Sequence, residues 1–230
     1  MFRPILPLLV FIAASVPSAA QQWVGSAGVN YGTYSMKSLK ELQEATLDSE
    51  IPLEIVESFP SRAGFEFSIL RTFGNFSVGV TASKASTGGR VSYADYSGSI
   101  NHDIIVNNTI TAVQLENNLV QKEAWELLFS MRSGVAFNTM KYNTTLSIGN
   151  ETDNLGEKFK SINFALSAGI GARFFYHKFF VHPEFRYETH LAKGDLHYSD
   201  DSDVALEVNN ERVQVGWDGI RLSLSLGYRL

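Results

Sequence analysis

The 230-residue sequence has no cysteine, only 6 prolines, and no apolar segment after residue 20 that approaches the length of a membrane-spanning helix. The absence of cysteine excludes disulfide bonds and a lipid anchor on an N-terminal cysteine. Strong charge is also lacking, because 19 Lys and Arg stand against 24 Asp and Glu. This small acidic excess argues against nucleic acid as a partner. Residues 86–90 are too short for a nucleotide-binding loop, and we expect no cofactor.

The first 20 residues have the pattern of a cleaved export signal. Arg3 supplies the positive charge, residues 5–14 form an apolar stretch, and Ala20 ends a small-residue cleavage site. The apolar stretch is about half of the roughly 20 residues that a spanning helix needs. We therefore predict a signal peptide over residues 1–20 and a single domain over residues 21–230.

The remaining chain is rich in aromatic residues (12%) and glycine (18 residues), and its apolar residues recur with period two. Near the C-terminus, for example, Ile220 and Leu222 alternate with Arg221 and Ser223. Successive side chains of a β-strand point to opposite faces, so this period predicts strands with one apolar and one polar face. The predicted strands lie at about 23–32, 64–73, 76–86, 104–119, 125–138, 160–176, 179–190 and 220–230. In 104–119 the phase is ambiguous, and we favour Thr109, Thr111, Val113 and Leu115 outward, with Gln114 inward.

The expected connections alternate between short and long. Gly74-Asn75, His177-Lys178 and a segment near 119–123 are short, whereas about 35–63, 87–103, 141–158 and 191–212 are long. Tight turns at one end and long loops at the other are typical of outer-membrane barrels. The polar strand face holds Gly, Ser, Asn, Glu and Arg, with Lys largely in loops, which suits a filled lumen. We predict an all-β, eight-stranded antiparallel transmembrane β-barrel with long external loops, and a soluble lipocalin-like barrel or sandwich is the alternative.

The first long loop is expected to contain one short helix. Ser38 and Glu41 have the spacing of a capping box, in which the serine caps the helix start and the glutamate reaches back. Leu39 and Leu42 then share a narrow apolar stripe, which Ala45 or Thr46 extends. We therefore expect the helix to lie on the barrel mouth.

The polar strand faces place charged side chains inside the predicted barrel. The expected lumen residues are Glu66, Glu116, Glu126, Arg132, Arg173, His182, Glu184, Arg186, Glu188, Arg221 and Arg229. A lone buried charge is costly, so we predict an ion-paired network that plugs the barrel, in which Glu184 and Arg186 pair with Arg and Glu residues on adjacent strands. Eight strands leave an interior just wide enough for side chains, although a selectivity lining remains the alternative. His182 and His190 lie more than about 20 Å apart along one strand, so no metal site is predicted.

Several segments resemble small outer-membrane barrel proteins of Bacteroidota, namely residues 34–40, 86–90 and 95–98 with the glycine-rich first strand. The architecture resembles the OmpA transmembrane-domain, OmpX and OmpW group. Residues 222–230 are similar to the signal that the barrel-assembly machinery reads, although Leu230 stands where Phe is usual. The resemblance implies a porin-like monomer in the outer membrane of a Gram-negative cell, in contact with outer-membrane lipid, lipopolysaccharide and, during insertion, the assembly machinery. It implies no catalytic residue.

Three functional hypotheses follow. The first is a non-enzymatic barrel with a plugged lumen, which acts through its external loops in envelope structure or surface interaction. The second is a narrow conduit for small or apolar solutes. The third is a lipid A-modifying enzyme that uses His197 and Ser199 with Glu207 or Glu211, in an acidic loop.

Two positions predict irregular pairing. Pro183 lies in the middle of a strand and has no N–H to donate, so we predict a β-bulge there, with an incompletely closed barrel as the alternative. A second irregularity is expected at Asp218-Gly219, where the apolar face shifts from Val213, Val215 and Trp217 to Ile220 and Leu222.

A closed barrel has no free edge and resists detergent, so the protein should be heat-modifiable, migrating differently in gels before and after boiling. Cell fractionation provides the second measurement. Recovery of the protein in the soluble fraction without detergent would contradict the barrel.

Overall fold

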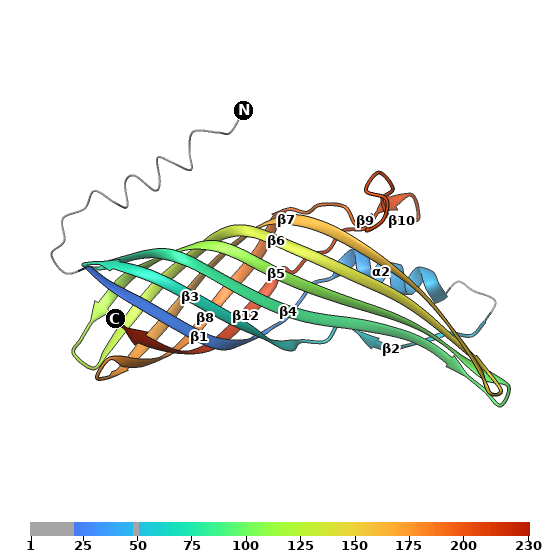
Figure 1. Ribbon diagram of the computed structural model, residues 1–230, viewed down its shortest axis with the longest axis horizontal. Helices are drawn as coiled ribbons and strands as arrows, with labels where there is room; N and C mark the ends of the chain where they lie inside the picture. Colours follow the sequence, from blue (N-terminus) through green and yellow to red (C-terminus); the bar gives the residue numbers. More distant parts are fainter. Residues whose placement is uncertain (1–20, 48–50) are drawn as a thin grey trace.

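The computed structural model describes residues 21–47 and 51–230, and in it eight strands form a closed antiparallel ring (Figure 1). The ring strands are β1 (Gln21–Gly32), β3 (Arg62–Phe73), β4 (Phe76–Ala94), β5 (Gly98–Gln121), β6 (Trp125–Ile148), β7 (Glu151–Tyr176), β8 (Phe179–Ala192) and β12 (Gly219–Arg229). Each ring strand pairs with the next, and β12 closes the ring on β1. The predicted eight-stranded barrel is confirmed. The expected signal peptide lies outside the described residues.

The outer surface of the ring is an apolar belt. Phe67, Ile170 and Leu226 are 60%, 53% and 66% exposed, whereas directly adjacent residues such as Glu66 and Ser225 are buried inside the ring. The favoured phase of β5 is correct, because Val113 is exposed and Gln114 is buried. In the described part of the chain, no helix is long and apolar enough to cross a membrane. A belt of this kind around a closed ring is suited to hydrocarbon and not to water.

The short turns lie together at one end of the barrel. They connect β3 to β4 at Gly74-Asn75, β5 to β6 through residues 122–124, and β7 to β8 at His177-Lys178. Gly74 and His177 have positive φ angles of 60° and 55°, which such tight turns require. We call this the turn end, and the opposite end the outer mouth.

Two of the predicted long loops are wrong, because 87–103 and 141–158 are mostly strand. β4 pairs with β5 as far as Ala94 and Ser99, and β6 pairs with β7 as far as Ile148 and Glu151. The four strands are 19 to 26 residues long, whereas about 9–11 tilted residues span a membrane. They continue beyond the outer mouth as a sheet, the projecting sheet, made of residues 86–94, 98–108, 138–148 and 151–160 (Figure 1). Its Asn- and Thr-rich sequence lacks the apolar period that identified the other strands.

The remaining elements form a cap on the projecting sheet. They are α2 (Lys37–Leu47), β2 (Glu54–Ser58), β9 (His197–Tyr198), β10 (Glu207–Val208) and β11 (Glu211–Arg212). β2 pairs with β4 and β9 pairs with β7, while α2 contacts β4, β2 and β10. Together with the projecting sheet they bury a hydrophobic core, which we call the cap core: Tyr34, Met36, Leu39, Phe59, Ile104, Val106, Met140, Phe159, Leu196, Val213, Val215 and Trp217.

The predicted helix is confirmed, but its predicted start is wrong. The helix already includes Lys37, so Ser38 lies in the first turn and does not precede it. Met36, with a φ of 45°, is the residue before the helix, and its carbonyl accepts a hydrogen bond from Lys40 N (3.0 Å). Met36 N in turn donates to Gly216 O (3.3 Å), so the contact with the segment before β12 fixes where the helix begins.

The predicted β-bulge at Pro183 is wrong. Pro183 faces Leu224 of β12 in unshifted register. On the other side, pairing with β7 runs from Tyr176–Phe179 to Phe174–Val181 and resumes at Gly171–Glu184 without a change of register. The proline therefore interrupts the ladder locally, and the barrel does not open there. The register shift between β7 and β8 lies instead opposite Phe164 and Ala165.

The second expected irregularity is present. Trp217 is fully buried in the cap core, whereas Ile220, three residues later, is on the outer surface. β12 begins only at Gly219, and a Cβ at this position would lie 2.1 Å from Thr33 O. The chain therefore passes from cap to barrel at Asp218-Gly219, in close contact with the chain leaving β1.

The cap core should unfold separately from the barrel. Replacing Phe159 with alanine should destabilise the cap by about 3–5 kcal/mol, because a fully buried aromatic ring is lost. Limited proteolysis should then cut within residues 191–217, while the heat-modifiable barrel persists. Phe137→Ala on the outer surface is the control, and equal protease resistance of the two variants would contradict a separate cap core.

Candidate functional site: the charged lumen and the outer mouth

All eleven predicted lumen residues point inward, and ten of them form ion pairs. Ten are buried, while the Arg229 side chain is 26% exposed at the turn end. Their ion pairs fall into three clusters along the barrel, which we call central, turn-end and outer.

The central cluster is a four-membered lattice. Arg132 on β6 contacts Glu66 on β3 at 3.3 Å and Glu184 on β8 at 2.7 Å. Arg186 on β8 contacts the same two carboxylates, at 2.7 and 2.9 Å. Ser130 and Ser223 donate to Glu184, and Ser225 donates to Glu66. Each arginine therefore bridges both glutamates, and the remaining carboxylate lone pairs are satisfied by hydroxyl groups.

The lattice connects strands that are not neighbours. We expected Glu184 and Arg186 to pair with residues on adjacent strands, but β8 adjoins β7 and β12, whereas the partners lie on β3 and β6. Long arginine side chains reach across the narrow lumen because small residues make room for them. At Gly169, for example, a Cβ would lie 2.5 Å from the Cβ of Arg186.

The turn-end cluster fills the lumen beside the short turns. Arg173 on β7 pairs with Glu116 on β5 and with Glu126 on β6, the latter at 3.2 Å. Arg229 on β12 also contacts Glu126 (3.2 Å), and its guanidinium lies 3.4 Å from the centre of the Phe175 ring. A polar hollow of about 270 Å³ opens at this end, and Arg173, Arg229 and Glu126 are among its lining residues.

The outer cluster joins the lumen to the cap. Arg221 pairs with Glu188 (2.8 Å) and also donates to the backbone carbonyls of Thr33 (3.2 Å) and Trp217 (3.0 Å). The same guanidinium lies 4.5 Å from the ring centre of Tyr34, a residue of the cap core. One arginine thus contacts barrel and cap together, a role that alternation alone could not predict.

The junction between cap and barrel has a second ionic contact, at Asp218. Lys193 Nζ lies 2.5 Å from its carboxylate, and His190 N and Thr189 Oγ1 also donate to it. Partial burial acts to raise the pKa of Asp218, but these donors outweigh it and hold the pKa below its usual range. Asp218 is therefore a charged anchor at the start of β12.

His182 is the one predicted lumen residue outside the ion-pair clusters. It is buried, and its Nε2 has no hydrogen-bond partner among the described residues. A Cβ at Gly171 would lie 2.4 Å from this atom, so the missing side chain of Gly171 provides the space for the ring. No group of three or more His, Asp or Glu suited to a metal ion occurs within residues 21–47 and 51–230.

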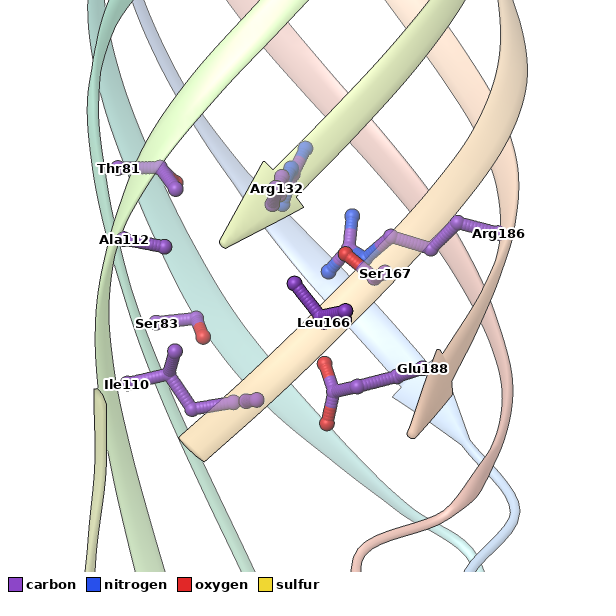
Figure 2. A pocket seen from close by; sticks show the side chains of 10 residues that line it. Thr81, Ser83, Ile110, Ala112, Arg132, Leu166, Ser167, Arg186 and Glu188 are labelled. Carbon is purple, nitrogen blue, oxygen red and sulfur yellow. The ribbon is translucent and has the colours of Figure 1, made fainter. Parts of the chain in front are cut away.

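Little space remains around the lattice. Figure 2 shows Arg186 and Glu188 extending from the barrel wall into the interior toward Ser83 and Thr81. Two cavities beside Arg186 measure about 10 Å³ each, which is about the space that one water molecule needs. A larger hollow of about 300 Å³, which Arg132 also lines, lies against the outer wall beside the exposed residues Val113, Met131 and Tyr187. The centre of the lumen is therefore filled by side chains.

Among the described residues, no hydrogen bond or ion pair joins the side chains of His197, Ser199, Glu207 and Glu211, the candidate lipid A-modifying residues, to one another. His197 lies in β9, and Ser199 follows it, with Ser199 N donating to Lys158 O (2.8 Å). Buried His197 Nδ1 and Ser199 Oγ have no hydrogen-bond partner in the described chain. Glu207 lies 3.8 Å from Arg212 instead.

The closed ring, the apolar belt and the filled lumen define an outer-membrane β-barrel. Similar solved structures include Ail, the attachment invasion locus protein of Yersinia pestis (16% identity, TM-score 0.37, 92% of this chain and 100% of that chain). Neisserial surface protein A (10%, 0.35, 92% and 99%) and a major outer membrane protein from Thermus thermophilus (10%, 0.48, 92% and 100%) are also similar. Comparisons with protein-family models and with curated proteins give no match. The assignment to this class rests on the ring and belt.

Loss of one lattice carboxylate should destabilise the barrel strongly. Glu184→Leu leaves Arg132 and Arg186 sharing only Glu66, and removal of one partner from a buried pair costs about 3–5 kcal/mol. The measurement is the free energy of unfolding by urea in lipid vesicles. Glu151→Leu at the exposed tip of β7 is the control, and equal unfolding midpoints for the two variants would refute a stabilising lattice.

Proposed function

We propose that this protein is a closed, non-enzymatic outer-membrane barrel that acts through its projecting sheet and cap in interactions at the cell surface. The observation that supports the proposal is the length of β5, β6 and β7, since more than half of each strand is not needed to cross the membrane. These strands are stabilised by a core of their own. The barrel then serves to anchor a folded surface domain.

The tip of the projecting sheet offers apolar groups that the cap does not cover. Ile148 and Leu155 are 60% and 68% exposed, and Tyr96 in the β4–β5 turn is fully exposed. Exposed apolar residues grouped on a folded, water-facing surface are typical of interaction sites. Their position far from the belt favours a partner outside the membrane.

The filled lumen favours this proposal over a conduit. Passage through the centre would require separation of the Arg132, Arg186, Glu66 and Glu184 lattice, which leaves buried charges unpaired. Purified protein in planar bilayers should therefore show no stepwise conductance. A steady conductance that persists after removal of contaminating porins would support the conduit and refute the plug.

Shortening both hairpins tests the surface role. Deleting residues 93–100 and 144–155, with an Asn-Gly turn at each junction, removes Tyr96, Ile148 and Leu155 and leaves every residue of the cap core in place. Cells with the shortened protein should match wild type in its membrane level and heat-modifiability, but attach to one another and to protein-coated surfaces as poorly as cells lacking the gene. Wild-type attachment by these cells would overturn the proposed role of the tip.

A further inference from the structure

Three lysines share the outward face of β6 and β7, where these strands leave the apolar belt. Lys141 and Lys158 are direct cross-strand partners, and Lys160 lies two residues further along the same face. All three side chains are exposed. Cβ atoms of directly opposite residues lie about 4.5–5.5 Å apart, and like charges in such a pair repel each other. The register therefore concentrates positive charge at a cost to the isolated protein.

The neighbouring carboxylates do not neutralise these lysines. None of the three forms an ion pair within the part of the chain that the structure describes. Asp103 on β5 is bonded by Arg90 through two nitrogens, at 2.5 and 2.9 Å. Glu157 lies on the opposite face of β7, where its negative charge interacts with the hydroxyl groups of Tyr142 and Tyr198.

An acidic turn also comes near, because Ser199 N donates to Lys158 O and the aspartates at 200, 201 and 203 follow. These aspartates form no ion pair with the three lysines among the described residues. The positive charge of the cluster is therefore available to an external anion.

The position of the three lysines relative to the apolar belt identifies the kind of anion that they would bind. The cross-strand pair Phe137–Ile162 belongs to the belt, with exposures of 48% and 61%, and the next outward pair toward the mouth is Thr139–Lys160. Lys141–Lys158 follows after two more residues, about 7 Å further along the strand. The ammonium groups therefore lie at the level of lipid headgroups, on the side of the membrane opposite the short turns.

We propose that Lys141, Lys158 and Lys160 bind the phosphate groups of a phosphorylated glycolipid in the outer leaflet, such as lipopolysaccharide. Ammonium groups are strong phosphate donors, and each lysine near an anionic membrane surface adds to binding. Thr139 and Asn143, on the same outward face of β6, supply neutral hydrogen-bonding groups beside the charges. Bound phosphate would also remove the repulsion between Lys141 and Lys158. This site is separate from the sheet tip to which the surface role is assigned.

The test compares a triple variant, Lys141→Gln, Lys158→Gln and Lys160→Gln, with the full wild-type protein in vesicles that contain fluorescent lipopolysaccharide. A charge-matched control changes Lys40, Lys122 and Lys178 to Gln. We expect at least tenfold weaker binding for the triple variant only, and no difference between the proteins with dephosphorylated lipopolysaccharide. Equal binding by the triple variant and wild type, or an equal loss with dephosphorylated lipid, would overturn the site.

Two further measurements separate lipid from free anion and from misfolding. Millimolar inorganic phosphate should not displace the lipid, and displacement at that concentration would indicate a site for soluble phosphate and refute the glycolipid. In lipopolysaccharide-free detergent, the triple variant should unfold at the same or a higher urea concentration than wild type, because repulsion is relieved. Lys158→Gln alone should show a smaller loss of binding, and full binding by this variant would contradict the role of the cross-strand pair.

Discussion

The barrel depends on one arrangement of charges, the lattice in which Arg132 and Arg186 each contact both Glu66 and Glu184. Eight strands with an apolar outer face must place their polar residues in an interior only as wide as the side chains themselves. Ionised groups are stable there only when each has a partner. Because the partners lie on β3, β6 and β8, meeting this electrostatic requirement also fixes distant walls of the ring relative to one another.

A second requirement arises outside the membrane, where β4 to β7 continue into water. A bare four-stranded sheet would expose both faces, and the cap covers one of them with α2 and the segments between β8 and β12. Arg221 joins the two regions, since it pairs with Glu188 in the lumen and contacts Trp217 and Tyr34 at the cap. The Arg221 guanidinium therefore connects the anchor in the membrane to the folded surface domain, beside the contacts of Asp218 and the continuous strands β4 to β7.

Sequence alternation predicted which face each strand residue occupies, and it placed Glu184, Arg186 and the other lumen charges correctly. It did not predict their partners, because a contact such as Arg186–Glu66 depends on the width and stagger of the closed ring and not on spacing along a strand. It also missed the projecting sheet, since residues such as Thr145 and Ser147 lie beyond the apolar belt and show no apolar period. Alternation also did not predict the role of Trp217, because this residue belongs to the cap core and not to the belt.

The most direct measurement of the central claim is the coupling energy between Glu66 and Arg186 across the lumen. A double-mutant cycle with Glu66→Leu and Arg186→Met, measured by urea unfolding in lipid vesicles, isolates the interaction between side chains on opposite sides of the ring. We expect a favourable coupling of about 1–3 kcal/mol, the upper range for residues in one charged network. Additive effects of the two substitutions would show that the lattice does not hold the walls together, and would contradict the account.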